Sequence, residues 1–298
     1  MSTVLDREEY IEQAYFFRVY RERLLENVPS QEVLKTIQEE ILAHTRLPMA
    51  IDFLRTEILH TGRISPAMFR LGHYFAPFQA FVISRAEDDE SRFEQITALR
   101  ILESEAQYRS QNASMAGLFI FQFECIARNR LGYTEGLNAM SGDPLYSDDW
   151  KRWISRLKLN LGEKELPDIV YAASQHFVNR RSSLKSPHSA IPAGTPPQPS
   201  EQPAMLFGDQ EGRIAKANIG RDPLYFFAAL QRQLSYPAVP RSQADSEETK
   251  KLPPFLEARL NKIEQRLKIT EMEVKGGIDL SKFYKSPDGE APKFEDQG

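Results

Sequence analysis

The chain has 298 residues, of which 41% are hydrophobic and 27% charged, a composition that can bury one or two ordinary cores. Its 38 basic and 42 acidic residues give a formal charge of −4, so no overall positive field attracts nucleic acid or an anionic membrane. The apolar runs are far shorter than the roughly 20 residues of a membrane-spanning helix. The N-terminus lacks the basic and then apolar pattern of a secretory signal. A single cysteine, Cys125, excludes a disulfide within the chain. We therefore expect a cytoplasmic protein.

The apolar residues of the first 180 positions have helical spacing. They recur three and four positions apart, and no stretch alternates apolar and polar residues as a half-buried strand does. Residues 49–83 hold the densest mixture of apolar and aromatic side chains, so we expect them in the core. The predicted fold class is all-α, either a multi-helix bundle or an irregular helical array. Helices are predicted for residues 5–27, 30 to about 45, 52–60, 65 to a kink or end at 77, 86–110, 114–131, 148–157 and 167–178.

Local signals mark several of these helix ends. Gly62 follows an apolar helical run and suits the left-handed conformation that closes a helix. Ser147 precedes another run and is expected to cap it. The acid-rich residues 87–90 are expected to lie in the first turn of the 86–110 helix, where their charge would complement the helix dipole.

Changes in composition divide the chain into six segments. Residues 182–204 hold six prolines and almost no large apolar residue, which is typical of an extended linker. In the next segment a short hairpin around Gly208 is expected, followed by a helix after Asp222 that is too short to be stable alone and must dock in cis or on another protein. The predicted segments are a helical domain (1–183), a Pro-rich flexible linker (184–204), a small docking module (205–240), a polar linker (241–252), a coiled-coil-like helix (253–275) and a mostly disordered tail (276–298).

The leading functional hypothesis is a non-enzymatic adaptor or scaffold protein. Apolar residues spaced four and three apart predict a short coiled-coil seam in residues 253–275, and four large apolar residues interrupt an otherwise polar tail. A protein partner or self-association through residues 253–284 is expected, although the tail could instead pack onto its own chain. The predicted partner-binding residues are Leu256, Leu260, Ile263, Leu267, Val274, Ile278, Leu280, Phe283 and Tyr284.

The first alternative is a helical metal-dependent or redox enzyme. Glu57 and His60 form a Glu-x-x-His pair on one helical face, as a di-metal site in a four-helix bundle requires. That site needs a second such pair, and no other histidine has a glutamate three residues earlier. The sequence contains no nucleophile elbow, phosphate-binding loop, dinucleotide loop or zinc-protease motif. No metal and no cofactor is therefore expected. Cys125 lies in the most apolar run, so we interpret it as structural rather than nucleophilic.

The second alternative is a nucleic-acid-associated regulator. Basic residues and a tryptophan gather around the middle of the chain, namely Arg128, Arg130, Lys151, Arg152 and Trp153, the mixture of a phosphate-binding and base-stacking surface. Acidic residues interleave with them, which favours an ordinary solvated helix face.

A short motif near the second linker resembles a recognition peptide. Residues 237–241, Pro-Ala-Val-Pro-Arg, have the form of a polyproline ligand for an aromatic groove, a pattern that also arises by chance in linkers.

Overall fold

The computed structural model of the chain describes residues 4–89, 93–184 and 205–241. These residues belong to the first of two units, Met1–Ser242; the second, Gln243–Gly298, lies outside them. The described residues form helices without a sheet, which confirms the all-α prediction, and none of these helices has both the length and the apolarity to cross a bilayer. The helices are α1 (Arg7–Leu25), α2 (Ser30–Glu40), α3 (Leu47–Thr61), α4 (Ser65–Arg70), α5 (Pro77–Ala86), α6 (Gln95–Ser110), α7 (Met115–Asn129), α8 (Tyr133–Ser141), α9 (Asp148–Asn160), α10 (Leu166–Ala172), α11 (Gln175–Leu184), α12 (Asp209–Ala217) and α13 (Pro223–Leu234).

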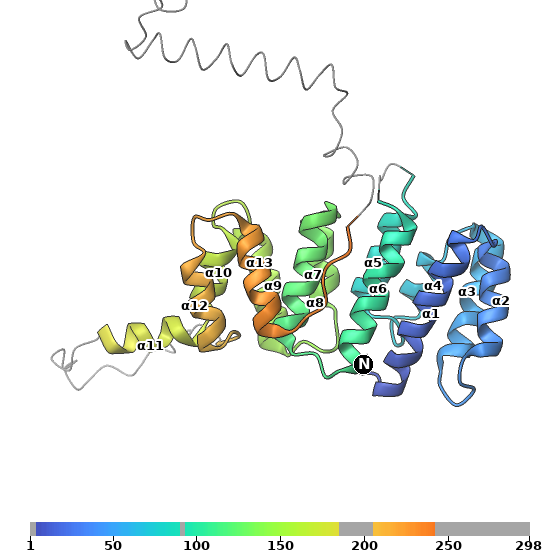
Figure 1. The fold of residues 1–298 in the computed structure, drawn as a ribbon, viewed down its shortest axis with the longest axis horizontal. Helices are drawn as coiled ribbons and strands as arrows, with labels where there is room; N and C mark the ends of the chain where they lie inside the picture. The colour runs from blue at the N-terminus through green and yellow to red at the C-terminus, as the bar shows by residue number, and fades with distance from the viewer. Residues whose placement is uncertain (1–3, 90–92, 185–204, 242–298) are drawn as a thin grey trace, which may run out of the picture. The chain divides into compact units, whose positions relative to one another are not determined.

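The helices of this unit follow one another as a row of neighbours rather than as a closed bundle (Figure 1). Starting from α3, each helix contacts the next in the order α2, α1, α6, α7, α13, α12 and α11. The most extensive contact is between α1 and α6. Phe16, Phe17 and Tyr20 of α1 are buried in the core. Of the two predicted architectures, the irregular helical array is the one observed.

The helix ends of the first third follow the sequence signals in part. Gly62 ends α3 in the left-handed region, with φ of 72°. The acidic residues near 87 were wrongly placed, because α6 begins only at Gln95 and Glu87 instead follows the end of α5. There the Glu87 carboxylate accepts the backbone N–H groups of Ile64 (2.6 Å) and Ser65 (3.0 Å), so it complements the start of a different helix, α4.

The buried central helix predicted around residue 120 is confirmed as α7. Every residue from Gly117 to Ile126 is buried. Ser114 caps the helix, since its Oγ accepts the Gly117 N–H at 3.0 Å. Helix α8, which the sequence analysis did not anticipate, packs on α7 through Gly136, whose missing side chain leaves room for Ile126.

The segment 205–241 docks in cis. The expected hairpin is wrong, because the residues after Gly208 form α12, which packs on α10 and α13. Ahead of it, the ring of Phe207 lies 5.2 Å from that of Trp150 and 5.5 Å from that of Trp153. Phe226 of α13 is fully buried, and α13 packs on α7. The short helix is therefore stabilised by this tertiary packing rather than by its own propensity.

We predict that G117A destabilises the fold although alanine is the better helix former. An added Cβ at Gly117 would overlap the Tyr108 hydroxyl, which donates a hydrogen bond to the Leu234 carbonyl at 3.0 Å. The expected loss in the free energy of unfolding is about 1–3 kcal/mol, by urea unfolding followed by circular dichroism. The control G72A adds a Cβ 3.4 Å from the Phe69 carbonyl oxygen, an ordinary contact, and should have little effect. Equal stability of G117A and wild type would contradict this packing.

Candidate functional site

The chemistry-bearing residues that the fold brings together most closely form a buried ionic cluster. Arg109 of α6 donates to Glu105 Oε1 at 2.9 Å and to Asp143 Oδ1 at 3.2 Å, with a further bond to Asp143 Oδ2. The Arg109 side chain is 1% exposed and both carboxylates are 0% exposed. One guanidinium thus holds two carboxylates in the protein interior, and removing it alone would leave two buried carboxylates without a cation.

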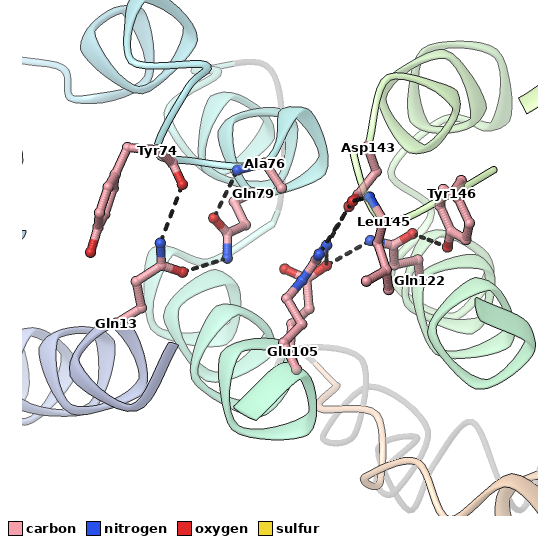
Figure 2. Close-up of polar contacts among 10 residues, drawn as sticks. Gln13, Tyr74, Ala76, Gln79, Glu105, Gln122, Asp143, Leu145 and Tyr146 are labelled. Atoms are coloured by element: carbon pink, nitrogen blue, oxygen red, sulfur yellow. Dashed lines mark hydrogen bonds and ion pairs between the residues drawn. The ribbon is translucent and has the colours of Figure 1, made fainter. Parts of the chain in front are cut away.

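The cluster extends across three elements (Figure 2). The Gln122 side chain of α7 donates to Glu105 Oε1 at 2.6 Å, and the Tyr146 hydroxyl donates to Gln122 Oε1 at 2.8 Å. Asp143 Oδ1 also accepts the backbone N–H of Leu145 at 2.9 Å, which fixes the connection between α8 and α9. The network therefore joins α6 and α7 to the α8–α9 connection through side-chain hydrogen bonds.

Burial and neighbouring charges shift the pKa values of Arg109, Tyr146 and the nearby Cys125. Burial lowers the pKa of Arg109, but the carboxylates of Asp143 and Glu105 raise it more, and the net pKa lies well above its usual value. Burial, reinforced by Asp143, raises the pKa of Tyr146. Burial and the nearby carboxylates Glu105 and Glu124 likewise raise the pKa of the Cys125 thiol. The thiol stays protonated at neutral pH, as the structural interpretation of Cys125 expects.

A second buried polar group joins α1 to the start of α5 (Figure 2). The Gln13 amide donates to the Tyr74 carbonyl at 3.4 Å, and Gln79 donates to Gln13 Oε1 at 3.1 Å. Gln79 Oε1 accepts the backbone N–H of Ala76 at 3.1 Å, which satisfies a donor ahead of the helix. These amides are buried and paired, so they position helices and present nothing to a substrate.

The candidate pair Glu57 and His60 is engaged elsewhere or exposed. Glu57 is 13% exposed and forms an ion pair with Arg70 of α4, whose guanidinium lies 5.3 Å from the centre of the Phe53 ring. His60 is exposed in the last turn of α3. Over the described ranges, no three histidine, cysteine, aspartate or glutamate side chains are grouped as metal ligands. The structure thus gives Glu57 a cationic partner in place of a metal.

The basic and aromatic residues of the nucleic-acid alternative do not form one surface. Arg128 pairs with Glu124, and Arg152 donates to Asp149 at 2.6 Å. The Trp153 ring is partly buried and packs edge-on to Phe119, with the ring centres 4.9 Å apart, so packing against the core covers part of the surface that base stacking would need. Of the remaining two residues, Arg130 ends α7 with φ of 53° and Lys151 is half-buried.

A group of exposed apolar side chains lies on the neighbouring helices α3 and α4. We call Met49, Phe53, Phe69 and Arg70 the α3–α4 surface. Met49 is 71% exposed and Phe69 53% exposed, while Phe53 lies under the Arg70 guanidinium. Met49 and Phe53 are four residues apart and so share a helix face. Exposed large apolar residues on neighbouring elements are a common mark of a protein-binding surface.

The predicted partner residues between Leu256 and Tyr284 lie outside the described residues. The scan of family models, the search of curated proteins and the search of solved structures each found no match to this chain.

The sequence analysis missed the Arg109 cluster. Its signal is the spacing of Glu105 and Arg109, one helical turn apart and flanked by the apolar residues Leu102 and Ala106. Asp143 lies 34 residues away, in a connection whose position only the fold decides.

We predict that R109M strongly destabilises the protein. The substitution leaves Glu105 and Asp143 buried without their cation, and the expected loss is about 3–5 kcal/mol in the free energy of unfolding. The matched control R152M removes an exposed ion pair with Asp149 and an exposed hydrogen bond to the Asp148 carbonyl, and it should cost less than about 1 kcal/mol. Urea unfolding measures both. Adding E105Q and D143N to R109M should restore part of the loss, and equal effects of R109M and R152M would refute the role of the cluster.

We predict that Cys125 reacts with a thiol reagent only through unfolding. Its side chain is fully buried and its pKa is raised, so the native rate at pH 8 should fall by about three orders of magnitude or more for an opening free energy of about 4 kcal/mol. Absorbance of the released chromophore measures the rate, with the guanidinium-unfolded chain as the reference. Rapid labelling of folded protein would show that the α7 environment is open.

Proposed function

We propose that this protein is a non-enzymatic cytoplasmic adaptor whose helical array presents a docking surface. The observation that carries the proposal is the α3–α4 surface, where Met49 and Phe69 are each more than half exposed on neighbouring helices. Exposed apolar side chains of this size lower solubility unless a partner covers them. The partner predicted for this surface offers an apolar face with a polar rim, since Arg70 and Glu57 border the apolar residues.

The proposal assigns the C-terminal segments a second role. Residues 253–275 carry the heptad spacing of a short coiled coil and would supply self-association or a helical partner. The apolar residues from Ile278 to Tyr284 would act as a docking peptide. Linked in one chain, the two sites raise each other's effective concentration, so a partner that engages both gains avidity without any new contact.

The two alternatives draw less support. Glu57 is paired with Arg70 and Trp153 packs against Phe119, so one of the two residues named for metal binding and the residue named for base stacking are engaged in structural contacts.

The adaptor proposal predicts that charge on the α3–α4 surface abolishes capture of a partner. The full-length variant M49D/F69D should recover about tenfold less of the principal partner than wild type in a quantitative pull-down from native lysate, because both aspartates enter an apolar contact. The matched control is L159D: Leu159 is 78% exposed on α9, and its neighbours in the sequence, Lys158 and Asn160, are polar. L159D should behave as wild type.

The C-terminal role has its own variant. The full-length variant L260E/L267E disrupts the predicted seam and should reduce the molar mass by light scattering, or remove a distinct partner from the pull-down. If M49D/F69D, L260E/L267E and L159D all match wild type in captured partners and in mass, the adaptor proposal is wrong.

A further inference from the structure

The segment after α13 lies against the side of α7 (Figure 1). We call residues 236–241 the strap; it lies outside the helices. Its anchor is Tyr236, which is 3% exposed. The Tyr236 hydroxyl donates to Glu124 Oε2 at 2.7 Å, with the Phe227 carbonyl oxygen 3.0 Å away as a second acceptor. The ring packs edge-on to Phe121. The predicted polyproline ligand is therefore already seated on its own chain.

The rest of the strap is held by few groups. The Asn129 side chain donates to the Pro240 carbonyl at 3.1 Å, and Val239 is only partly buried. Pro237 and Pro240 have no N–H, so fewer backbone groups of this stretch need a hydrogen-bond partner. Their φ angles are fixed, so the stretch stays extended when it is free. We call Phe121, Glu124 and Asn129 of α7, with the Phe227 carbonyl, the strap seat.

The strap does not use all the hydrogen-bonding capacity at its seat. Among the described residues, Asn129 Oδ1 and Arg128 Nη1 are buried without a hydrogen-bond partner. The Asn129 amide nitrogen donates to the carbonyls of Cys125 and Pro240, both at 3.1 Å, which identifies Oδ1 as the free acceptor. Pro240, whose carbonyl accepts from the same Asn129 side chain, has no N–H with which to satisfy this oxygen. A segment with an N–H donor in place of Pro240 would pair better.

The strap can leave without unravelling its neighbours. The end of α13 is held independently, because the Tyr108 hydroxyl donates to the Leu234 carbonyl at 3.0 Å. Ser235, in the left-handed region with φ of 53°, is the single residue that joins α13 to the strap. When Tyr236 leaves, Glu124 keeps its ion pair with Arg128 and so is not left as an uncompensated buried charge.

We propose that the strap seat recognises a tyrosine-anchored, extended segment of a partner protein, and that the strap occupies this site in cis as a competitor. Glu124 would accept a hydrogen bond from the tyrosine hydroxyl of the segment, and Asn129 would donate one to a backbone carbonyl, as they do with the strap. This site is on α7 and is separate from the α3–α4 surface and the C-terminal segments of the proposed function.

The test uses fluorescein-labelled peptide SYPAVPR, the chain's own strap sequence, and full-length protein. The variant Y236A removes the cis anchor and should bind the peptide at least about tenfold more tightly than wild type by fluorescence anisotropy, because the tethered strap competes at high effective concentration. The peptide SFPAVPR, which lacks the hydroxyl read by Glu124, should bind Y236A about tenfold more weakly. The peptide SYPAVAR, which regains an N–H, should bind at least as tightly as SYPAVPR.

A second variant guards against misfolding of Y236A. Y236F keeps the ring and loses only the hydroxyl, so it should fold as wild type by circular dichroism and should bind SYPAVPR more tightly than wild type does. If folded Y236A and Y236F bind the peptide no better than wild type, the strap is purely structural and the proposal fails. A wild-type dimer by light scattering that Y236A abolishes would overturn the assignment to a partner protein, because the occupant would then be the strap of a second copy. Neither outcome depends on M49D/F69D or L260E/L267E.

Discussion

The pairing of Arg109 with two carboxylates is the interaction on which the middle of this array depends. Arg109 lies on α6, the helix that makes the largest contact with α1, and its guanidinium also lies 5.8 Å from the centre of the Tyr10 ring. On its other side it holds Asp143 and, through Glu105, the Gln122 amide of α7. Because a buried carboxylate without its cation is costly, this geometry restricts the register in which α1, α6, α7 and the α8–α9 connection pack together.

In this array, potentially reactive polar groups are buried while several large apolar side chains are exposed. Potentially reactive groups such as Glu105, Cys125 and Tyr146 are interior, and burial raises the pKa of both the Cys125 thiol and the Tyr146 hydroxyl. Several large apolar side chains, Met49 among them, instead stand in solvent. An interior committed to positioning and a surface with exposed apolar residues suit a protein whose work is contact with other macromolecules. This division is the physical basis of the adaptor proposal.

How much could be read from the sequence depended on how local the determining interactions are. The capped helices after Ser114 and Ser147 and the end at Gly62 were predictable, because the relevant hydrogen bonds and φ angles involve residues a few positions apart. Glu87 was misassigned because its partners, the N–H groups ahead of α4, lie more than 20 residues earlier. The same limit hid the Arg109 cluster and the partner of Glu57. Local patterns in the sequence determined the helices and several of their ends. Pairing between distant residues determined which polar side chains remain free to bind something else.

The strap extends this lesson to short motifs. A proline-rich peptide in a linker is usually read as a ligand for some other protein, yet here the segment ending at Arg241 lies on α7 of its own chain. Cis binding does not make the motif meaningless, because a tethered segment needs only modest intrinsic affinity to stay bound. The unused Asn129 Oδ1 and Arg128 Nη1 indicate a seat that its present occupant fills incompletely. The strap covers this site, leaves some of its hydrogen-bonding groups unpaired and is joined to α13 by one residue, Ser235. These are the properties of a competitor that a partner can displace. On this proposal, α7, the most buried of the described helices, also carries the site at which the strap regulates contact with a partner.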